Sequence, residues 1–484
     1  MKRILFSVIL SGLVLVSCKK DITDLNQNPK QPENVSVASL YANASINLAD
    51  VLASPNVNTN IFRLFSQQWS ETTYPDETNY DLDGRSIPDR WFTEFYRDVI
   101  KDLAQAAVLL ETEKDQAPIM TDAEYKNRKA EIELLQVFAY YHLVTTFGNI
   151  PYSEALNPEI IQPKYDDAAT VYADLITRLD AALGLIDTGE EGFGSADILF
   201  DGDMEAWERF GNSLKMRMGM VILDVDVAKG TSMVLAAAPK VVSSNAENLK
   251  MNFLSAPPNT NPVWEDLVQS GRYDFVGSNT LVNQMKTLND TRIPLFFEKN
   301  ENGDYAGGIY GSANTYINFS APSATITRPD YPLTFFSYAE MEFYKAELAA
   351  RGIAIGGTAE EHYNKAIDAS FEEWGGTAAQ ALTYRSQPSV KWSGVADWKQ
   401  KIGIQSWIAL YNRGYDAWTQ WRRLDYPQLQ PPPDGLFANG ETPGVPVRYT
   451  YPVVEQNLNK ANYNEAAAAI GKDRITQKLW FDKF

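Results

Sequence analysis

An aromatic-rich stretch near the C-terminal end, residues 404–427 (IQSWIALYNRGYDAWTQWRRLDYP), most constrains how this chain can fold. Four of its rings, Trp407, Tyr411, Tyr415 and Trp418, recur at steps of four, four and three residues, which predicts one face of a helix. Burying a ring of this size removes about 150–250 Å² of surface from water. We therefore expect a core helix whose partners come from distant parts of the chain.

Two consecutive arginines, Arg422 and Arg423, lie toward the end of this stretch. A guanidinium group can be buried only where carboxylates or carbonyls accept its hydrogen bonds. The pattern predicts a buried helix with a charged end.

Several motifs in this chain resemble those of the SusD/RagB family. In the aromatic stretch they are Q-S-W at 405–407, the run of rings and the paired arginines before Pro427. Others follow in order: GNIPYSEAL at 148–156, WERFGNSLKMR at 207–217, FFSYAEMEFYKAE at 335–347, YPVVEQNLN at 451–459 and WFD at 480–482. Gly211 stands where the family commonly has Ala, and Thr291 where relatives often carry Pro. The resemblance spans nearly the whole mature chain.

The N-terminus is typical of a lipoprotein signal. Lys2 and Arg3 precede an apolar run at 4–16, which is too short to remain as a membrane-spanning helix. Leu15-Val16-Ser17-Cys18 then forms a lipobox. We expect residues 1–17 to be removed and Cys18, the only cysteine, to be lipidated. The alternative is an ordinary signal peptide with a chance cysteine.

Residues 18–36 are polar and contain two prolines, which predicts an extended tether behind the lipid. The whole chain carries a net charge of −19, and removal of residues 1–17 leaves 41 basic and 62 acidic side chains, a net charge of −21. Nucleic acid is therefore not an expected partner, because phosphate contacts need a basic face.

Residues 37–484 are predicted to form a single, mainly α-helical domain with tetratricopeptide-like helical hairpins and an irregular, loop-rich second lobe. Helical periodicity is expected at 38–54, 61–70, 91–110, 121–147, 167–186, 204–223 and 333–374. Between about 257 and 332, Gly, Pro, Asn and Asp crowd together, and we expect turns and one helix near 281–288.

The sequence carries no signature of catalysis. Its two histidines, His142 and His362, belong to no metalloprotease or hydrolase motif, and no phosphate-binding loop is present. We expect His142 to be a core or surface residue and the protein not to be an enzyme. No cofactor is expected, although residues 81–84 and 300–304 resemble calcium loops without the EF-hand spacing.

The long loop at 71–88 and the irregular lobe combine aromatic and polar side chains. Flat rings meet the C–H faces of sugars, while charged and amide groups bond the hydroxyls, and such sites usually lie on loops. The predicted ligand-binding residues are Trp69, Tyr74, Tyr80, Trp264, Arg272 and Tyr273. Tyr305, Tyr310 and Tyr316 add to the same aromatic set. The alternative is that these rings only pin their loops.

The resemblance implies a lipid-anchored protein on the outer membrane of a Bacteroidetes-type bacterium. In that family the protein partners a SusC-like TonB-dependent transporter, captures an oligosaccharide and delivers it as a lid. The alternatives are a peptide- or glycopeptide-binding lipoprotein, a surface glycosidase and a structural scaffold. An acidic helical face would be the docking surface for the transporter.

Overall fold

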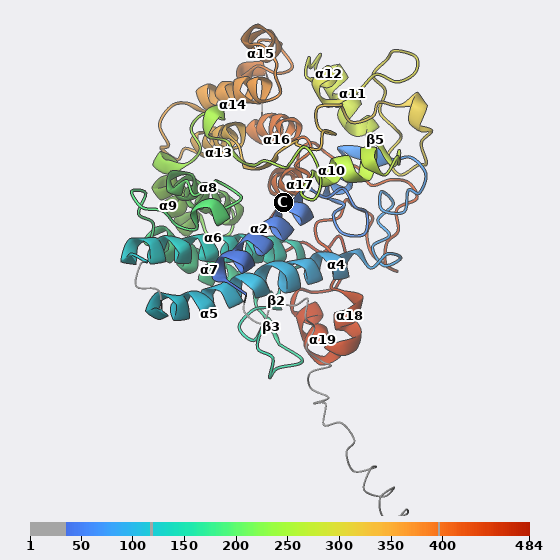
Figure 1. Cartoon of the computed structure of the whole chain (residues 1–484). Coiled ribbons are helices and arrows are strands. Elements are labelled where there is room, and N and C mark those ends of the chain that lie inside the picture. Colours follow the sequence, from blue (N-terminus) through green and yellow to red (C-terminus); the bar gives the residue numbers. More distant parts are fainter. Residues whose placement is uncertain (1–34, 117–119, 395–396) are drawn as a thin grey trace, which may run out of the picture. The chain divides into compact units, whose positions relative to one another are not determined.

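The computed structural model describes residues 35–116, 120–394 and 397–484. Residues Val37–Phe484 form one compact unit (Figure 1). The predicted signal peptide, Cys18 and most of the tether lie outside the described residues.

Helices make up most of the unit, as predicted. The longer ones are α2 (Val37–Ala53), α4 (Ile87–Thr93), α5 (Lys101–Gln116), α6 (Asp122–Phe147), α7 (Ala168–Leu183), α8 (Met204–Ile222), α9 (Val227–Ala237), α11 (Asn279–Thr287), α13 (Tyr338–Ala350), α14 (Ala359–Glu373), α15 (Ala378–Arg385), α16 (Trp398–Ala409), α17 (Gly414–Leu424), α18 (Val453–Leu458) and α19 (Lys460–Ala469). Three are short: α3 (Phe62–Phe65), α10 (Pro262–Trp264) and α12 (Ile293–Phe296).

Six short strands pair in three antiparallel ribbons within the described ranges. They are β1 (Trp69–Glu71) with β5 (Phe275–Gly277), β2 (Ile150–Pro151) with β3 (Tyr165–Asp166), and β4 (Leu249–Met251) with β6 (Leu333–Phe336). The β1–β5 and β4–β6 ribbons join segments far apart in the sequence, whereas β2–β3 lies within the connection between α6 and α7. The β1–β5 ribbon ties the N-terminal part of the chain to the irregular region.

Neighbouring helices pack in pairs, α6 with α7, α8 with α9, α13 with α14 and α16 with α17 (Figure 1). This confirms the prediction of a mainly helical, tetratricopeptide-like scaffold. Local signals define its helices well. Thr121 caps α6 by accepting a hydrogen bond from the Glu124 amide at 3.0 Å, and Gly148, with φ of 88°, ends it.

The aromatic stretch forms two helices, so the prediction of one continuous helical face was wrong. The chain turns between α16 and α17, where Asn412 adopts a φ of 66°. Gly414 lets the turn approach α3 closely, because a Cβ there would lie 2.3 Å from the Arg63 backbone nitrogen. The burial prediction was right, since Trp407 and Trp418 are fully buried.

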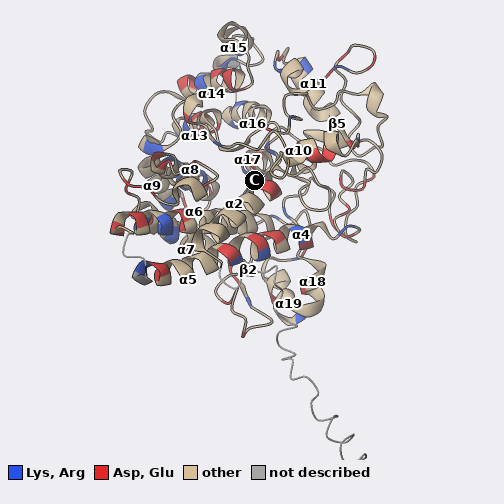
Figure 2. Cartoon of the chain, in the orientation of Figure 1, with Lys and Arg blue, Asp and Glu red and all other residues tan. Residues whose placement is uncertain are grey.

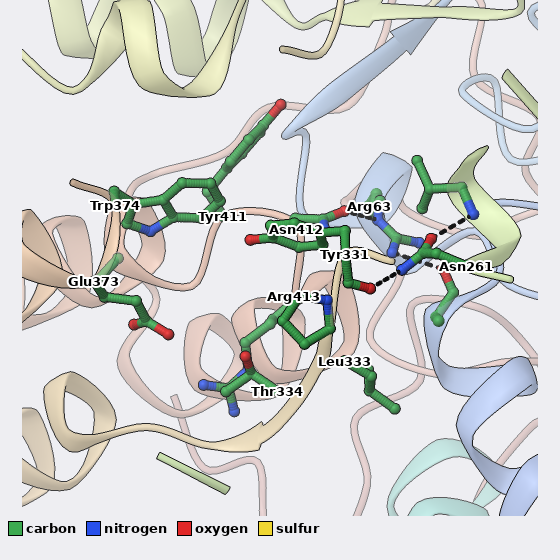
Figure 3. Close-up of a pocket in the computed structure, with 14 residues that line it drawn as sticks. Arg63, Asn261, Tyr331, Leu333, Thr334, Glu373, Trp374, Tyr411, Asn412 and Arg413 are labelled. Carbon is green, nitrogen blue, oxygen red and sulfur yellow. Dashed lines mark hydrogen bonds between the residues drawn. The ribbon is translucent and has the colours of Figure 1, made fainter. Parts of the chain in front are cut away.

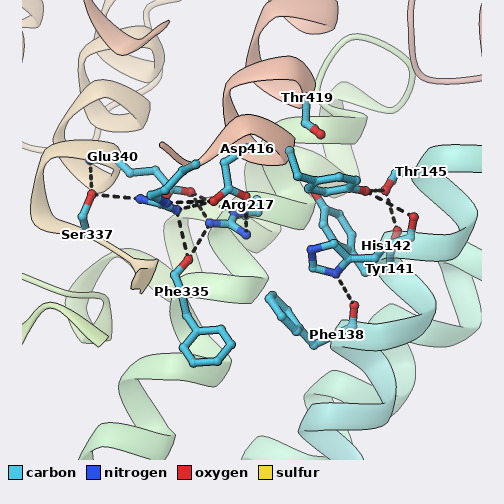
Figure 4. A network of polar contacts seen from close by, with 12 residues as sticks. Phe138, Tyr141, His142, Thr145, Arg217, Phe335, Ser337, Glu340, Asp416 and Thr419 are labelled. Carbon is cyan, nitrogen blue, oxygen red and sulfur yellow. Dashed lines mark hydrogen bonds and ion pairs between the residues drawn. The ribbon is translucent and has the colours of Figure 1, made fainter. Parts of the chain in front are cut away.

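Largely buried ion pairs connect this turn to the rest of the scaffold (Figure 4). Arg413 reaches Glu340 on α13 at 2.5 Å and Asp416 at 2.6 Å. Arg217 on α8 reaches the same two carboxylates at 2.7 and 3.1 Å. Two guanidinium groups facing two carboxylates leave no net charge buried, which is the condition for placing such groups in a core.

The two terminal arginines of α17 also have the partners that burial requires. Arg422 donates to the carbonyls of Thr145 and Val447 at 2.6 and 3.0 Å. Arg423 donates to the carboxylate of Glu347 at 2.7 Å. Both arginines therefore hold α17 to distant segments.

Two other helix boundaries differ from the prediction. Residues 61–70 form the single turn of α3 and then β1, because this segment pairs with β5. Residues 333–336 form β6 before α13 begins. In both cases pairing with a distant strand overrides the local helical pattern.

Candidate functional site

The β1–β5 ribbon brings two distant loops side by side. Glu71 pairs with Phe275, so the residues that leave β1 run beside those that enter β5. Thr72 continues the ribbon: its amide donates to the Asp274 carbonyl at 2.9 Å, and its hydroxyl donates to the Tyr273 carbonyl at 2.5 Å. Tyr74 and Tyr273 are thereby carried by joined segments.

Three tyrosines define what we call the aromatic platform: Tyr74, Tyr273 and Tyr316. Tyr74 is 62% exposed and Tyr273 is 61% exposed. The half-buried Tyr316 ring lies against Tyr273, with centroids 4.7 Å apart and planes inclined by 46°. Rings of this size left in water offer apolar faces to a partner.

A charged pair borders the platform. Arg272 donates through Nε to Asp274 at 2.6 Å, and both side chains are accessible. Asp274, and more weakly Asp266 and Tyr74, raise the pKa of Arg272. The pair therefore presents guanidinium donors and carboxylate acceptors beside the exposed rings.

Two predicted ligand residues lie in the core instead. Trp69 is 1% exposed, and its indole N–H donates to the Tyr411 hydroxyl at 3.1 Å. Tyr80 is 2% exposed and packs against Phe65 and Phe437. Neither ring offers a face to solvent, because residues from distant parts of the chain pack over both: Tyr411 and Phe275 against Trp69, and Phe65 and Phe437 against Tyr80.

The remaining aromatic predictions are mixed. Trp264 is half-buried at the end of α10, and its neighbours Pro262 and Glu265 line a separate hollow. Tyr310 is buried and donates to the Leu64 carbonyl at 2.8 Å. Tyr316 belongs to the platform whereas Tyr310 is buried, and the sequence around these two tyrosines carries no local signal that tells them apart.

The separate hollow, of about 360 Å³, is strongly acidic. It is lined by Asp50, Glu94, Asp98, Glu265 and Asp266 with Arg90. Figure 2 shows acidic residues in red along the ribbon that leads from α4 toward α5 and beside α10. Burial, and then Glu265 and Glu94, raises the pKa of Asp50 to about 7. A smaller hollow of about 110 Å³ adjoins it, because both are lined by Asn56 and Asp266, and reaches Arg272.

A third hollow, at the turn of Asn412, holds about 30 Å³ (Figure 3). That volume suits about one water molecule. Arg63 lines it, donating to Asn412 at 2.9 Å and to the Ser54 and Ala53 carbonyls. Burial lowers the pKa of Arg63 to about 10. This hollow belongs to the packing of the core.

No catalytic arrangement surrounds the histidines, both of which the structure describes. His142 is buried, with Nδ1 2.8 Å from the Phe138 carbonyl, and burial lowers its pKa to about 3. His362 lies 2.7 Å from Glu342. Among the described residues, no group of three or more His, Cys, Asp and Glu side chains is arranged to hold a metal ion. Within the same ranges every helix is too short or too polar to traverse a bilayer.

Residues 29–452 match the SusD-like family, described as starch-binding and associating with the outer membrane. The chain belongs to the SusD-like family. Curated protein sequences include no match to it.

Solved SusD-like structures share the fold. A chitin-binding SusD homologue from Flavobacterium johnsoniae is 24% identical, with a TM-score of 0.78 over 92% of this chain and 98% of that one. A SusD homologue from Bacteroides uniformis is 23% identical, with a TM-score of 0.77 over 92% and 99%. One from Bacteroides thetaiotaomicron is 22% identical, with a TM-score of 0.78 over 93% and 100%.

Proposed function

We propose that this SusD-like chain is a cell-surface binding protein for oligosaccharides, and that the aromatic platform is its ligand site. The observation that carries the proposal is the exposed Tyr273 ring packed against the half-buried Tyr316, with exposed Tyr74 on the adjoining loop. Within a mainly buried set of aromatic residues, these rings lie at a loop junction and face solvent. Membership of a family described as starch-binding supports the same interpretation.

Binding would be non-covalent. A sugar ring would lay its C–H face on Tyr273, while Arg272 and Asp274 bond its hydroxyl groups. No step breaks a bond, so the protein would act by capture and release. The chitin-binding activity of one structural relative is consistent with this class of ligand.

Capture at the cell surface requires an anchor and a route inward. We propose that cleavage before Cys18 and lipidation of this residue hold the chain to the outer membrane, with residues 19–36 as the tether. A single acyl chain anchors only weakly, so more than one is needed for stable attachment. The ligand would then pass to a SusC-like TonB-dependent transporter, the partner expected for the family.

Calorimetry on residues 19–484 tests the ligand site. The panel is maltohexaose, a six-unit N-acetylglucosamine oligomer and a mixture of soluble peptides, titrated into wild type, Tyr273→Ala and Phe484→Ala. Phe484 is the control, because it is an aromatic ring 49% exposed and far along the chain from the platform.

We expect one oligosaccharide to bind and Tyr273→Ala to weaken it about three- to tenfold, as loss of one ring contact predicts. Phe484→Ala should change nothing. Equal affinity in wild type and Tyr273→Ala would remove the platform from the site. Binding of peptides alone would replace the glycan proposal with the peptide-binding alternative.

A further inference from the structure

One buried side chain connects the segments that carry the aromatic platform. Asn314 is 4% exposed and lies two residues before Tyr316. Its Oδ1 accepts a hydrogen bond from the Ile309 amide at 2.7 Å. Its Nδ2 lies within hydrogen-bond distance of the Glu71, Ile309 and Ser312 carbonyls and the Ser70 hydroxyl, at 2.7 to 3.2 Å.

These bonds cross between two parts of the chain. Ser70 and Glu71 belong to β1, whereas Ile309 and Ser312 belong to the loop that leads to Tyr316. The backbone repeats the link, because the Asn314 amide donates to the Thr72 carbonyl at 2.7 Å. Asn314 therefore bonds the loop of Tyr316 to the strand that continues toward Tyr74.

Thr72 extends the connection to the third segment. Its amide and hydroxyl donate to the Asp274 and Tyr273 carbonyls, as described above. The segments 72–74, 272–274 and 309–316 thus meet at Thr72 and Asn314. Gly308 leaves the room that this needs, since a Cβ there would lie 2.9 Å from the Asn314 amide carbon.

We propose that Asn314 is a positioning residue for ligand binding, which couples the Tyr316 half of the platform to the Tyr74 and Tyr273 half. The inference rests on the proposed function, because it assigns Asn314 a role in the same site. Asn314 is buried and would act through the segments that carry the rings. A side-chain amide is needed, because one end must accept from an N–H while the other donates to carbonyls.

The test replaces Asn314 with Asp, which has the same shape and keeps an acceptor for the Ile309 amide. The second carboxylate oxygen would face the carbonyls of Glu71 and Ser312, which also carry lone pairs, so those bonds are lost. Asn318→Asp is the matched control. It makes the same chemical change at an exposed residue two positions beyond Tyr316.

Hydrogen–deuterium exchange tests the coupling without any ligand. Asn314→Asp should speed amide exchange in 309–318 and also in 72–74 and 272–274, whereas Asn318→Asp should leave the last two segments unchanged. Thr72→Val, which removes only the hydroxyl bond to Tyr273, should speed exchange in 272–274. Faster exchange confined to 309–318 in Asn314→Asp would overturn the coupling.

Calorimetry with maltohexaose and the six-unit N-acetylglucosamine oligomer tests the role in binding. We expect Asn314→Asp to weaken the bound sugar at least about fivefold at neutral pH. As the pH is lowered, protonation of the introduced carboxylate restores a donor, so the affinity relative to wild type at the same pH should recover. A merely destabilising substitution would not recover in this way.

The outcomes separate the two proposals. If exchange changes as expected but affinity does not, Asn314 is structural and the inference fails while the platform stands. If neither sugar binds wild type, the proposed function fails and the binding role of Asn314 fails with it, while the exchange result still decides the coupling.

Discussion

Arg423 on α17 donates to the carboxylate of Glu347 on α13 at 2.7 Å, and both side chains are buried. Arg423 also donates to the Met220 carbonyl on α8 at 3.0 Å. One guanidinium group therefore joins three helices that are far apart in sequence. Its placement explains why the aromatic stretch needs charged residues at its end.

Replacing Arg423 with Met should destabilise the protein by about 3 kcal/mol, because Glu347 loses its buried partner and keeps only the partly exposed Arg351. Arg328→Met is the control, since Arg328 pairs with Asp330 on the surface. That change should cost less than about 0.5 kcal/mol. Urea unfolding of both variants measures the difference, and equal losses would show that the buried pair adds nothing.

Stability should fall as the pH rises from about 5 to 8. Glu131 is buried beside Tyr41 and Asp197, and burial, then Asp197, raises its pKa to about 8. The folded state therefore holds a proton that the unfolded state releases near its ordinary carboxyl pKa. The free energy of unfolding then decreases with pH, by up to about 1.4 kcal/mol per unit from this one group.

Glu131→Gln should flatten that slope, because the amide cannot ionise. A residual slope is expected from Asp50, whose pKa is raised to about 7. Urea unfolding at several pH values between 5 and 8 checks this. A slope identical in wild type and Glu131→Gln would contradict the assignment.

Acidic oligosaccharides should bind more weakly than neutral ones of equal length. The chain has a net charge of −19, and Asp266 and Asp274 lie beside the platform in the hollow that Arg272 lines. Added salt should narrow the difference, because it screens exposed charges. Titration of galacturonate and neutral oligomers at low and physiological salt measures the effect, with Asp266→Asn expected to reduce it.

Gly414→Ala should destabilise the protein by about 3 kcal/mol or more, because the new Cβ would lie 2.3 Å from the backbone nitrogen of Arg63 and the turn between α16 and α17 would have to move. Gly444→Ala is the matched control, since its Cβ would meet only the Thr476 methyl at 3.5 Å. Thermal unfolding distinguishes the two. Similar melting temperatures would show that the turn can shift freely.

Periodicity and capping in the sequence were enough to predict α6 and α8, because those signals lie within one turn or repeat along one face. The aromatic stretch was predicted to be buried, since large rings gain most from leaving water. Its division into two helices was not predicted. That break depends on Gly414 meeting α3, a contact with residues far earlier in the chain.

For the site, too, the sequence predicted the kinds of residue but not which of them are exposed. Composition indicated that aromatic and polar residues near 69–80 and 264–316 could bind a ligand, and Tyr74, Arg272 and Tyr273 are exposed together at the end of the β1–β5 ribbon. Trp69 and Tyr80 are as aromatic as these but lie in the core.

By itself, the sequence determined the helical class, the family and the kinds of side chain available for binding. These depend on local periodicity, motif order and composition. Only the tertiary structure decided which rings face solvent and which segments meet at Asn314. Exposure is set by whatever packs over a residue, and that covering comes from distant parts of the chain.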